Sequence, residues 1–275
     1  MASMRVAVVQ LTAGADKADN LGRLTALVEQ AAAHGATLVV APEASMHEFG
    51  AATTALAPVA ETLDGPFVSG LVAVASRLGV TVLAGMFEVV PDEPSRAFNT
   101  VVAVGPDGHL LGRYRKQHLF DALGWVESHR LEPGDPHDRL LFACGDVTVG
   151  VLTCYDLRFP ELSRALVDDG AQLLAVPSAW VAGPLKEDQW STLVRARAIE
   201  NVVYVAAADQ SPPTYVGRAV VVDPFGVVLA AGADRDGVTV ADVDVDRLEE
   251  CRRRMPSLQH RRWSVSPRVA SRREG

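Results

Sequence analysis

Hydrophobic positions in the first half of the chain alternate between continuous apolar runs and helical spacing. The apolar runs at residues 4–11, 36–43 and 80–90 are long enough for buried strands. Between them, apolar residues recur at helical spacing over residues 16–35 and 67–79, and each of these patterns ends at a glycine. Strands that alternate with helices are typical of an α/β fold.

From residue 97 onward the pattern favours hairpins. Residues 97–116 contain two apolar runs around the turn sequence GPDG, and residues 140–154 contain two around CGD. Each predicts a β-hairpin, so at least part of the sheet should be antiparallel. The remaining predicted elements are strands at 171–180, 202–210 and 237–245, a hairpin at 217–230, and helices at 160–169, at 188–201 and ending near residue 255. We expect two mixed sheets packed face to face with helices outside.

Composition is that of an ordinary protein with a large core. The chain has 275 residues, of which 48% are hydrophobic and 22% charged, and it shows no linker or repeat, so we expect one domain spanning residues 1–275. No apolar run approaches the length of about 20 residues that a membrane helix needs. The three cysteines show no CxxC spacing, which argues against a disulfide framework or a zinc site. We therefore expect a cytoplasmic protein that does not bind membranes.

The net charge of −8 is distributed unevenly. Residues 251–275 contain eight arginines and one acid, Glu274, so this Arg-rich C-terminal tail carries +7 and the remaining chain carries −15. A basic tail can bind nucleic acid. However, the rest of the chain is acidic, and the tail arginines lie among apolar residues such as Leu258 and Trp263. We therefore expect the tail to pack on the body or on a partner subunit rather than to bind nucleic acid.

Three ionisable residues, Glu43, Lys116 and Cys154, each stand at the carboxyl end of a predicted apolar strand. Ligand sites of α/β folds lie at such strand ends. A cysteine attacks an acyl carbon only as its thiolate, so it requires a base or a field that lowers its pKa. Glu43 could act as the base, and Lys116 could stabilise both the thiolate and the oxyanion that follows attack on a carbonyl. Together the three residues predict nucleophilic catalysis by Cys154.

Other kinds of site have weaker support. Histidine is the more familiar partner of a catalytic cysteine, and His47 and His118 lie close in sequence to the candidate residues. No paired-histidine, CxxC or HExxH spacing suggests a metal, and neither a GxGxxG turn nor a phosphate-binding loop is present. We expect no metal and no cofactor.

Seven segments in order make the chain similar to a known family. They span nearly the whole sequence and read RVAVVQL, LVVAPE, GRYRKQHLFDA, ESHRLEPGD, GVLTCYDLRFPEL, QWSTLVRARAIENVVYVAA and VVVDPFGVVLA. In this arrangement the chain resembles the nitrilase superfamily of carbon-nitrogen hydrolases. The resemblance implies an α/β fold that forms a four-layer αββα sandwich with mixed sheets, usually paired into homodimers or larger assemblies.

The resemblance also implies roles for individual residues. Matched by motif, Glu43 is the general base, Lys116 stabilises the oxyanion and Cys154 is the nucleophile. Glu127 corresponds to a second carboxylate that orients the lysine and the substrate, and the backbone N–H of Tyr155 would contribute to the oxyanion hole. The implied reaction is hydrolysis of an amide through a thioester on Cys154, with release of ammonia and without a cofactor.

Within the superfamily, the segment CYDLRFPE together with HRR near the C-terminus resembles the Nit-type amidases, which include ω-amidase and deaminated glutathione amidase. Arg158 fits there as a fork that binds a substrate carboxylate. Its alternative role is a structural ion pair with Asp156 or Glu161. We expect the substrate to be a small amide that bears a carboxylate.

Two departures from the Nit-type pattern bear on the pocket. Only ten residues separate Lys116 from Glu127, which is shorter than in well-known Nit amidases, and the segment SAWVAGPLKEDQW replaces the simpler TGPAHW type. We expect Trp125 and Trp180 to build part of the pocket, which then need not admit the same amide.

The sequence is also compatible with other functions. On the same fold the chain could be a nitrilase or an N-carbamoyl amino acid hydrolase. From other classes, it could be a thiol redox enzyme, with Cys144 approaching Cys154 through the hairpin, or a binding protein whose catalytic set has lapsed.

Overall fold

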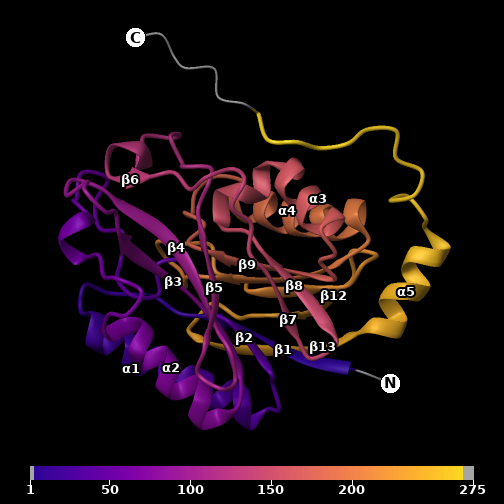
Figure 1. Ribbon diagram of the computed structural model, residues 1–275, viewed down its shortest axis with the longest axis horizontal. Helices are drawn as coiled ribbons and strands as arrows, with labels where there is room; N and C mark the ends of the chain where they lie inside the picture. Colours follow the sequence, from indigo (N-terminus) through magenta and orange to yellow (C-terminus); the bar gives the residue numbers. More distant parts are fainter. Residues whose placement is uncertain (1–2, 269–275) are drawn as a thin grey trace.

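The computed structural model describes residues 3–268, and Figure 1 shows its helices and strands coloured along the chain. The first half contains β1 (Ser3–Gln10), α1 (Lys17–Ala33), β2 (Leu38–Val40), α2 (Pro66–Leu78), β3 (Thr81–Val89), β4 (Ala97–Val104), β5 (Leu110–Arg115) and β6 (Leu131–Glu132). The second half contains β7 (Leu141–Cys144), β8 (Val147–Val151), α3 (Pro160–Asp168), β9 (Leu173–Ser178), α4 (Lys186–Asn201), β10 (Tyr204–Asp209), β11 (Val220–Val222), β12 (Val228–Ala231), β13 (Gly237–Asp244) and α5 (Val245–Arg254). Short 3-10 turns are η1 (Ala57–Val59), η2 (Glu127–His129) and η3 (Cys154–Arg158). Each predicted strand and helix has a counterpart, with bounds that differ by a few residues.

Local sequence signals fix the helix ends. The side chain of Asp16 accepts hydrogen bonds from the backbone N–H groups of Ala18 and Asp19, at 2.8 and 3.1 Å, so Asp16 is the N-cap of α1. Helix α2 begins at Pro66 and ends before Gly79, whose left-handed backbone (φ 66°) suits glycine.

Hydrogen bonds join the strands in the order β5-β4-β3-β2-β1-β10-β9-β8-β7. Strand β1 pairs along its whole length with β13, but it meets β10 at a single registered pair, Gln10 and Asp209. Parallel and antiparallel pairs both occur, as the hairpin signals predict. The narrow junction between β1 and β10 divides the strands into two halves.

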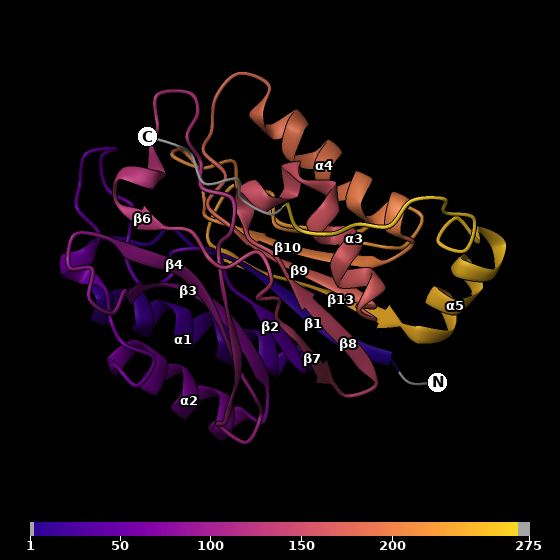
Figure 2. The same ribbon diagram turned by 45° about the horizontal axis from the view of Figure 1, so that its top comes forward.

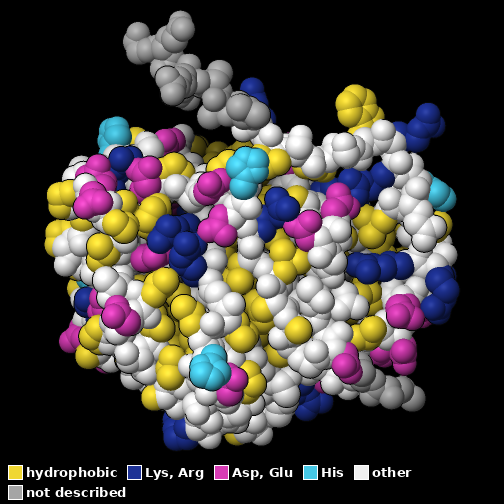
Figure 3. Space-filling view, in the orientation of Figure 1, with side chains coloured by type: hydrophobic (Ala, Val, Ile, Leu, Met, Phe, Trp, Pro, Cys, Tyr) yellow, Lys and Arg dark blue, Asp and Glu magenta, His cyan; other side chains and the backbone are white. Residues whose placement is uncertain are grey.

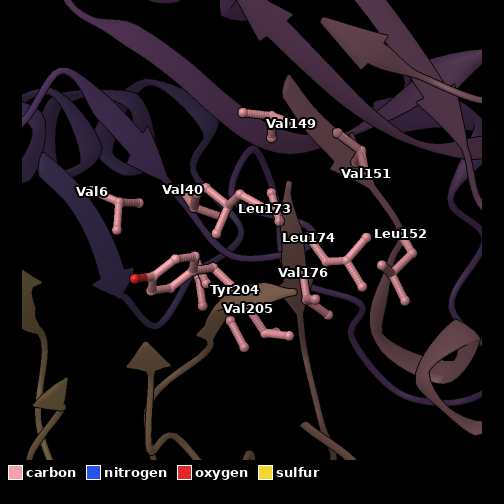
Figure 4. Close-up of a cluster of buried hydrophobic side chains, with 14 of the residues drawn as sticks. Val6, Val40, Val149, Val151, Leu152, Leu173, Leu174, Val176, Tyr204 and Val205 are labelled. Carbon is pink, nitrogen blue, oxygen red and sulfur yellow. The ribbon is translucent and has the colours of Figure 1, made fainter. Parts of the chain in front are cut away.

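The two halves pack face to face. On β1, Val6 and Val8 join a core cluster with residues of β8, β9 and β10, whereas Ala7 and Val9 pack with apolar side chains of α1 and α2. Figure 4 shows Val6 and Val40 from the first half in the same cluster as Leu173 and Tyr204 from the second. Helices α3 and α4 cover the outer face of the half that contains β8, β9 and β10, on the opposite side of the molecule from α1 and α2 (Figure 2). The layer order is helices, sheet, sheet, helices, so the predicted αββα fold is confirmed.

The described part of the Arg-rich tail contacts the body. Arg252 donates to the carbonyl oxygens of Val202 and Ala171, and Arg261 forms an ion pair with Asp168 at the end of α3. Leu258 packs against the core, whereas Trp263 is 88% exposed. Residues 269–275 of the predicted tail lie outside the described residues.

Basic and acidic side chains are interspersed on the face of the molecule drawn in Figure 3. Within residues 3–268, no helix has the length and apolar character needed to cross a membrane.

Candidate active site

The carboxyl ends of β2, β5, β8 and β9 meet at one edge of the fold. Strand β2 is parallel to β1 and β3, and two antiparallel steps through β4 bring β5 back to the same direction. Strands β10, β9 and β8 are parallel to one another, and β10 is parallel to β1. Glu43 follows β2, Lys116 follows β5 and Cys154 follows β8. The strand directions therefore bring the three predicted residues to a common edge.

Lys116 lies between two carboxylates. Its Nζ is 2.9 Å from Glu43 Oε1 and 2.9 Å from Glu127 Oε2, and only about 1% of the side chains of Lys116 and Glu43 is exposed. Glu127 begins the turn η2 and also accepts a hydrogen bond from the backbone N–H of Phe120, at 2.8 Å. The structure thus brings Glu127, predicted from the motif, into contact with Lys116.

Glu43 is held by donors from three other segments. Asn99 Nδ2 donates to Oε1 at 2.7 Å, and the backbone N–H of Ala179 donates to Oε2 at 2.8 Å. Gln210, after β10, donates to the backbone carbonyl of Glu43 at 3.0 Å. Because both carboxylate oxygens are engaged, the side chain has a fixed orientation.

The turn that carries Cys154 is strained and anchored by Asp156. Cys154 has a left-handed backbone with φ 47°, a conformation that is costly for a residue other than glycine. Fully buried Asp156 accepts hydrogen bonds from the Thr153 N–H at 2.9 Å and from the Tyr114 hydroxyl at 2.7 Å. It also bonds the backbone N–H and Nδ1 of His118, at 3.2 and 2.6 Å. Asp156 thereby ties the cysteine turn to the residues on either side of Lys116.

Burial and the two carboxylates set the protonation of the site. Burial raises the pKa of the Cys154 thiol well above its usual value, the charge of Glu43 adds to this, and Lys116 opposes it. Burial lowers the pKa of Lys116, but Glu127 and Glu43 outweigh this effect and hold it well above its usual value. Burial also raises the pKa of Glu127, against the opposing charge of Lys116. At neutral pH the resting site therefore combines a neutral thiol with a charged lysine.

Cys154 opens onto a pocket with aromatic walls. The pocket is lined by Phe49, Phe120, Trp125, Glu127, Arg130, Cys154, Tyr155, Ala179, Trp180, Val181, Lys186 and Tyr215. Trp125 and Trp180 are the two tryptophans expected there, and Tyr155 contacts the rings of Phe120 and Phe159. A buried thiol that lines such a pocket is suited to react with a small organic substrate.

Residues 5–253 match the family model for carbon-nitrogen hydrolase. The chain belongs to the carbon-nitrogen hydrolase family. The deaminated glutathione amidase of Escherichia coli O157:H7 is 38% identical over 238 residues, which cover 86% of this chain and 89% of the relative. The omega-amidase NIT2 of Mus musculus is 36% identical over 275 residues, covering 95% and 96%.

A solved structure agrees with these relatives. The crystal structure of a CN-hydrolase superfamily protein from Xanthomonas campestris, with an arsenic adduct in its active site, matches with a TM-score of 0.85 and 28% identity. The match covers 97% of this chain and 100% of that chain. The predicted membership of the nitrilase superfamily is confirmed.

Arg158 lies beside the pocket of this hydrolase rather than among its lining residues. Its Nη2 donates to Gln189 Oε1 at 2.6 Å, and its guanidinium lies 4.9 Å from the centre of the Trp180 ring. Within the described residues it forms no ion pair with Asp156 or Glu161, the alternative partners predicted from the sequence. Its role as a carboxylate ligand stays a prediction.

Several pocket residues of the hydrolase were not predicted from the sequence. Arg130 follows η2, Lys186 begins α4, and Tyr215 lies in the loop after β10. The only sequence signal for Lys186 is the unusual segment after β9 that contains it. Buried Asp209 was not predicted from the sequence either. Its Oδ1 accepts the backbone N–H of Trp180 at 2.7 Å, and this contact orients the segment after β9.

The other candidates do not line the pocket of Cys154. His47 contacts the carbonyl of Glu48, and the His118 ring stacks on Phe159 at 3.7 Å, so neither lines the pocket. Cys144 contacts Thr37 and Thr81 and lines a different hollow. Among the described residues, no group of three or more His, Cys, Asp or Glu side chains could hold a metal ion.

Proposed function

We propose that this hydrolase cleaves the C–N bond of a small amide that bears a carboxylate, through a thioester on Cys154. The observation that carries the proposal is the buried contact of Lys116 with both Glu43 and Glu127 beside the thiol. In such a group the cation can stabilise an oxyanion, and one of the carboxylates can accept and return a proton. The two amidase relatives, by their names, support an amide rather than a nitrile as substrate.

The first half of the reaction forms the thioester. Because the resting thiol is neutral, Glu43 takes its proton as the sulfur attacks the amide carbon. Lys116 and the backbone N–H of Tyr155 stabilise the oxyanion. When the C–N bond breaks, Glu43 returns the proton to the departing nitrogen, which leaves as ammonia or an amine.

The second half regenerates the thiol. Glu43 takes a proton from a water molecule that attacks the thioester carbon, and the carboxylic acid leaves as the thiolate recovers that proton. Glu127 keeps Lys116 in place through both halves, because its two oxygens lie 3.2 and 2.9 Å from Nζ. The mechanism requires no cofactor or metal.

The decisive experiment measures ammonia or amine release from a panel of substrates. The panel contains ω-amides, deaminated glutathione, N-carbamoyl amino acids and nitriles. We expect turnover of ω-amides or deaminated glutathione, no turnover by Cys154→Ala, and an acyl adduct on Cys154 by mass spectrometry after a rapid quench. Preference for nitriles or carbamoyl compounds would assign a different reaction to the same site.

Two further outcomes would overturn the proposal. Turnover by Cys154→Ala would exclude the thioester, and no turnover of any panel member would favour a binding protein with a lapsed catalytic set. Peroxide-dependent oxidation of Cys154 without amide turnover would favour the redox alternative, although no cysteine in residues 3–268 lines the pocket besides Cys154.

We also infer a homodimer that works in the cytoplasm. Exposed apolar side chains near the end of α4 and around the start of β12 support self-association, and they are Ile199, Val227, Val228 and Leu229. Gly226 places the turn before β12 against Ile199. Light scattering should give the mass of a dimer, and Val228→Lys should shift it to that of a monomer. The three cysteines are buried and unpaired, which fits a reducing compartment.

A further inference from the structure

Arg130 contributes a buried guanidinium to the wall of the active-site pocket. Only 5% of the residue is exposed, and its guanidinium carbon lies 5.7 Å from the centre of the Phe49 ring and 5.8 Å from that of Trp125. Both rings also line the pocket. The cation is therefore held between two aromatic walls of the cavity that contains Cys154.

Within residues 3–268, Arg130 uses only one of its terminal nitrogens. Nη1 donates to the backbone carbonyl oxygens of Phe49, Ala51 and Thr54, at 2.8, 3.0 and 3.1 Å. Its Nε and Nη2 are buried and have no hydrogen-bond partner among the described residues. No carboxylate in that part of the chain forms an ion pair with Arg130. The carboxylate of Glu127 lies nearby, but both of its oxygens contact Lys116 and one also accepts the Phe120 N–H.

We propose that Arg130 binds the substrate carboxylate through the edge of its guanidinium that Nε and Nη2 form. These two N–H groups are parallel and lie on the side of the planar group away from the Nη1 contacts, so they match the two oxygens of a carboxylate. Donors that are buried without a partner are costly. A carboxylate that displaces the flanking ring of Phe49 or Trp125 reaches this edge and satisfies both donors at once. The inference rests on the proposed amidase function and identifies the residue that selects its acid substrates.

The position of Arg130 gives the substrate a direction. The turn η2 connects Arg130 to Glu127, which contacts Lys116 beside the nucleophile. A substrate held at its carboxylate by Arg130 and at its amide carbonyl by Lys116 is fixed at two points along the pocket. Such two-point binding places the amide carbon relative to Cys154 and favours substrates with a defined spacing between acid and amide.

The other cations near the pocket are less suited to this role. Lys186 lies over the Trp180 and Phe120 rings, at 4.5 and 5.2 Å, and offers a point charge without a fork. Arg158 already donates from Nη2 to Gln189 and does not line the cavity. Arg130 alone among these three lines the pocket with two unpartnered N–H groups on one edge.

The test compares succinamate with butyramide, two amides that differ only in a carboxylate against a methyl group. The quantity measured is the ratio of kcat/KM for succinamate to kcat/KM for butyramide. Arg130→Gln should lower this ratio about 30-fold, the value of a charged hydrogen-bond pair, with the loss mainly in KM for succinamate. The same ratio for Arg158→Gln and Lys186→Gln should change far less.

A second variant addresses the structural contacts of Nη1. Arg130→Lys keeps a charged donor for the carbonyls of residues 49–54 but removes the fork, so it should also lower the ratio. If Arg130→Gln does not fold, the lysine variant carries the test. An unchanged ratio in the folded Arg130 variant, or a fall in Arg158→Gln or Lys186→Gln instead, would overturn the assignment.

Failure of this inference is distinguishable from failure of the proposed function. If the wild-type protein hydrolyses neither amide nor any other panel amide, the amidase proposal itself fails. If it hydrolyses succinamate through Cys154 and the Arg130 variants keep the wild-type ratio, only the role of Arg130 is refuted.

Discussion

The ammonium of Lys116 and the carboxylate of Glu43 meet at 2.9 Å with about 1% of either side chain exposed. A buried ion pair gains little net stability, because removing both charges from water offsets most of their attraction. Glu127 adds a second carboxylate to the same ammonium, so the group of three carries a net negative charge. Such an arrangement is better explained by proton transfer and oxyanion binding than by stability.

Replacing Lys116 should make stability depend strongly on pH. In Lys116→Met the carboxylates of Glu43 and Glu127 face each other without a cation, which should cost about 3–5 kcal/mol at pH 8. Burial already raises the pKa of Glu127 and Lys116 opposes this, so the variant should raise it further. The folded variant then retains a proton that the unfolded chain has lost, and stability falls as pH rises from the unfolded pKa through the folded pKa.

Chemical denaturation of Lys116→Met and wild type at pH 5.5 and pH 8 checks this sign. The deficit of the variant should be smaller at the lower pH. A deficit that is equal at both values, or larger at pH 5.5, would contradict the interaction between the two carboxylates.

Replacing Glu43 should separate the effect of its charge from its proposed role as the general base. The pKa of the Cys154 thiol is raised first by burial and then by the negative charge of Glu43. Glu43→Gln should therefore lower this pKa while reducing turnover by about 10²- to 10⁴-fold through loss of the base. The thiolate absorbance, taken as the difference from Cys154→Ala, measures the first effect and ammonia release the second. A more acidic thiol with undiminished turnover would exclude Glu43 as the base.

Much of the fold, and the edge at which the candidate catalytic residues lie, could be predicted from the sequence for a physical reason. Apolar runs and helical spacing report burial directly, so β1, α1 and the hairpins follow from pattern alone. Glu43, Lys116 and Cys154 each interrupt such a pattern at its carboxyl end. Their shared location then follows from strand direction, because the ends of β2, β5 and β8 meet at one edge.

The charged side chains of the pocket walls could not be predicted in the same way. Arg130 and Lys186 reach the pocket from a short turn and from the start of a helix that are 56 residues apart in sequence. No periodicity reports which edge of a guanidinium stays unpaired, because that depends on the carbonyls of residues 49–54. The left-handed backbone of Cys154 likewise depends on contacts that Asp156 makes with distant residues.

The Asp156 contacts predict a graded response to two substitutions. Tyr114→Phe removes one donor and leaves Oδ2 bonded to the Thr153 N–H, so it should cost about 1 kcal/mol of unfolding free energy. Asp156→Asn turns an amide group toward several donors and should cost about 3 kcal/mol. Because Asp156 holds the Cys154 turn, the asparagine variant should also lose turnover at temperatures where it is folded, whereas Tyr114→Phe should lose little. Equal losses in the two variants would show that Asp156 does not position the turn.

A glycine beside Glu43 gives a test of how precisely this proposed base must be placed. A Cβ on Gly85 of β3 would lie 2.4 Å from the backbone nitrogen of Ala44 and 2.7 Å from the Cα of Glu43. These are backbone atoms that cannot rotate away, so Gly85→Ala must displace the turn that carries Glu43. We expect a loss of about 1–3 kcal/mol in unfolding free energy from overpacking. A shift of the base by a fraction of an ångström to 1 Å should lower kcat by about 10²-fold.

Gly22 provides the matched control for the same chemical change. It lies exposed within α1, and a Cβ there would meet no atom within 4 Å. Gly22→Ala should therefore stabilise the protein by about 0.5–1 kcal/mol through helix propensity and leave kcat at the wild-type value. Thermal unfolding and amide turnover, measured on both variants, separate the two effects. If Gly85→Ala loses stability but keeps full turnover, the reaction tolerates a displacement of Glu43. Gly85 would then be required for packing and not for placing Glu43.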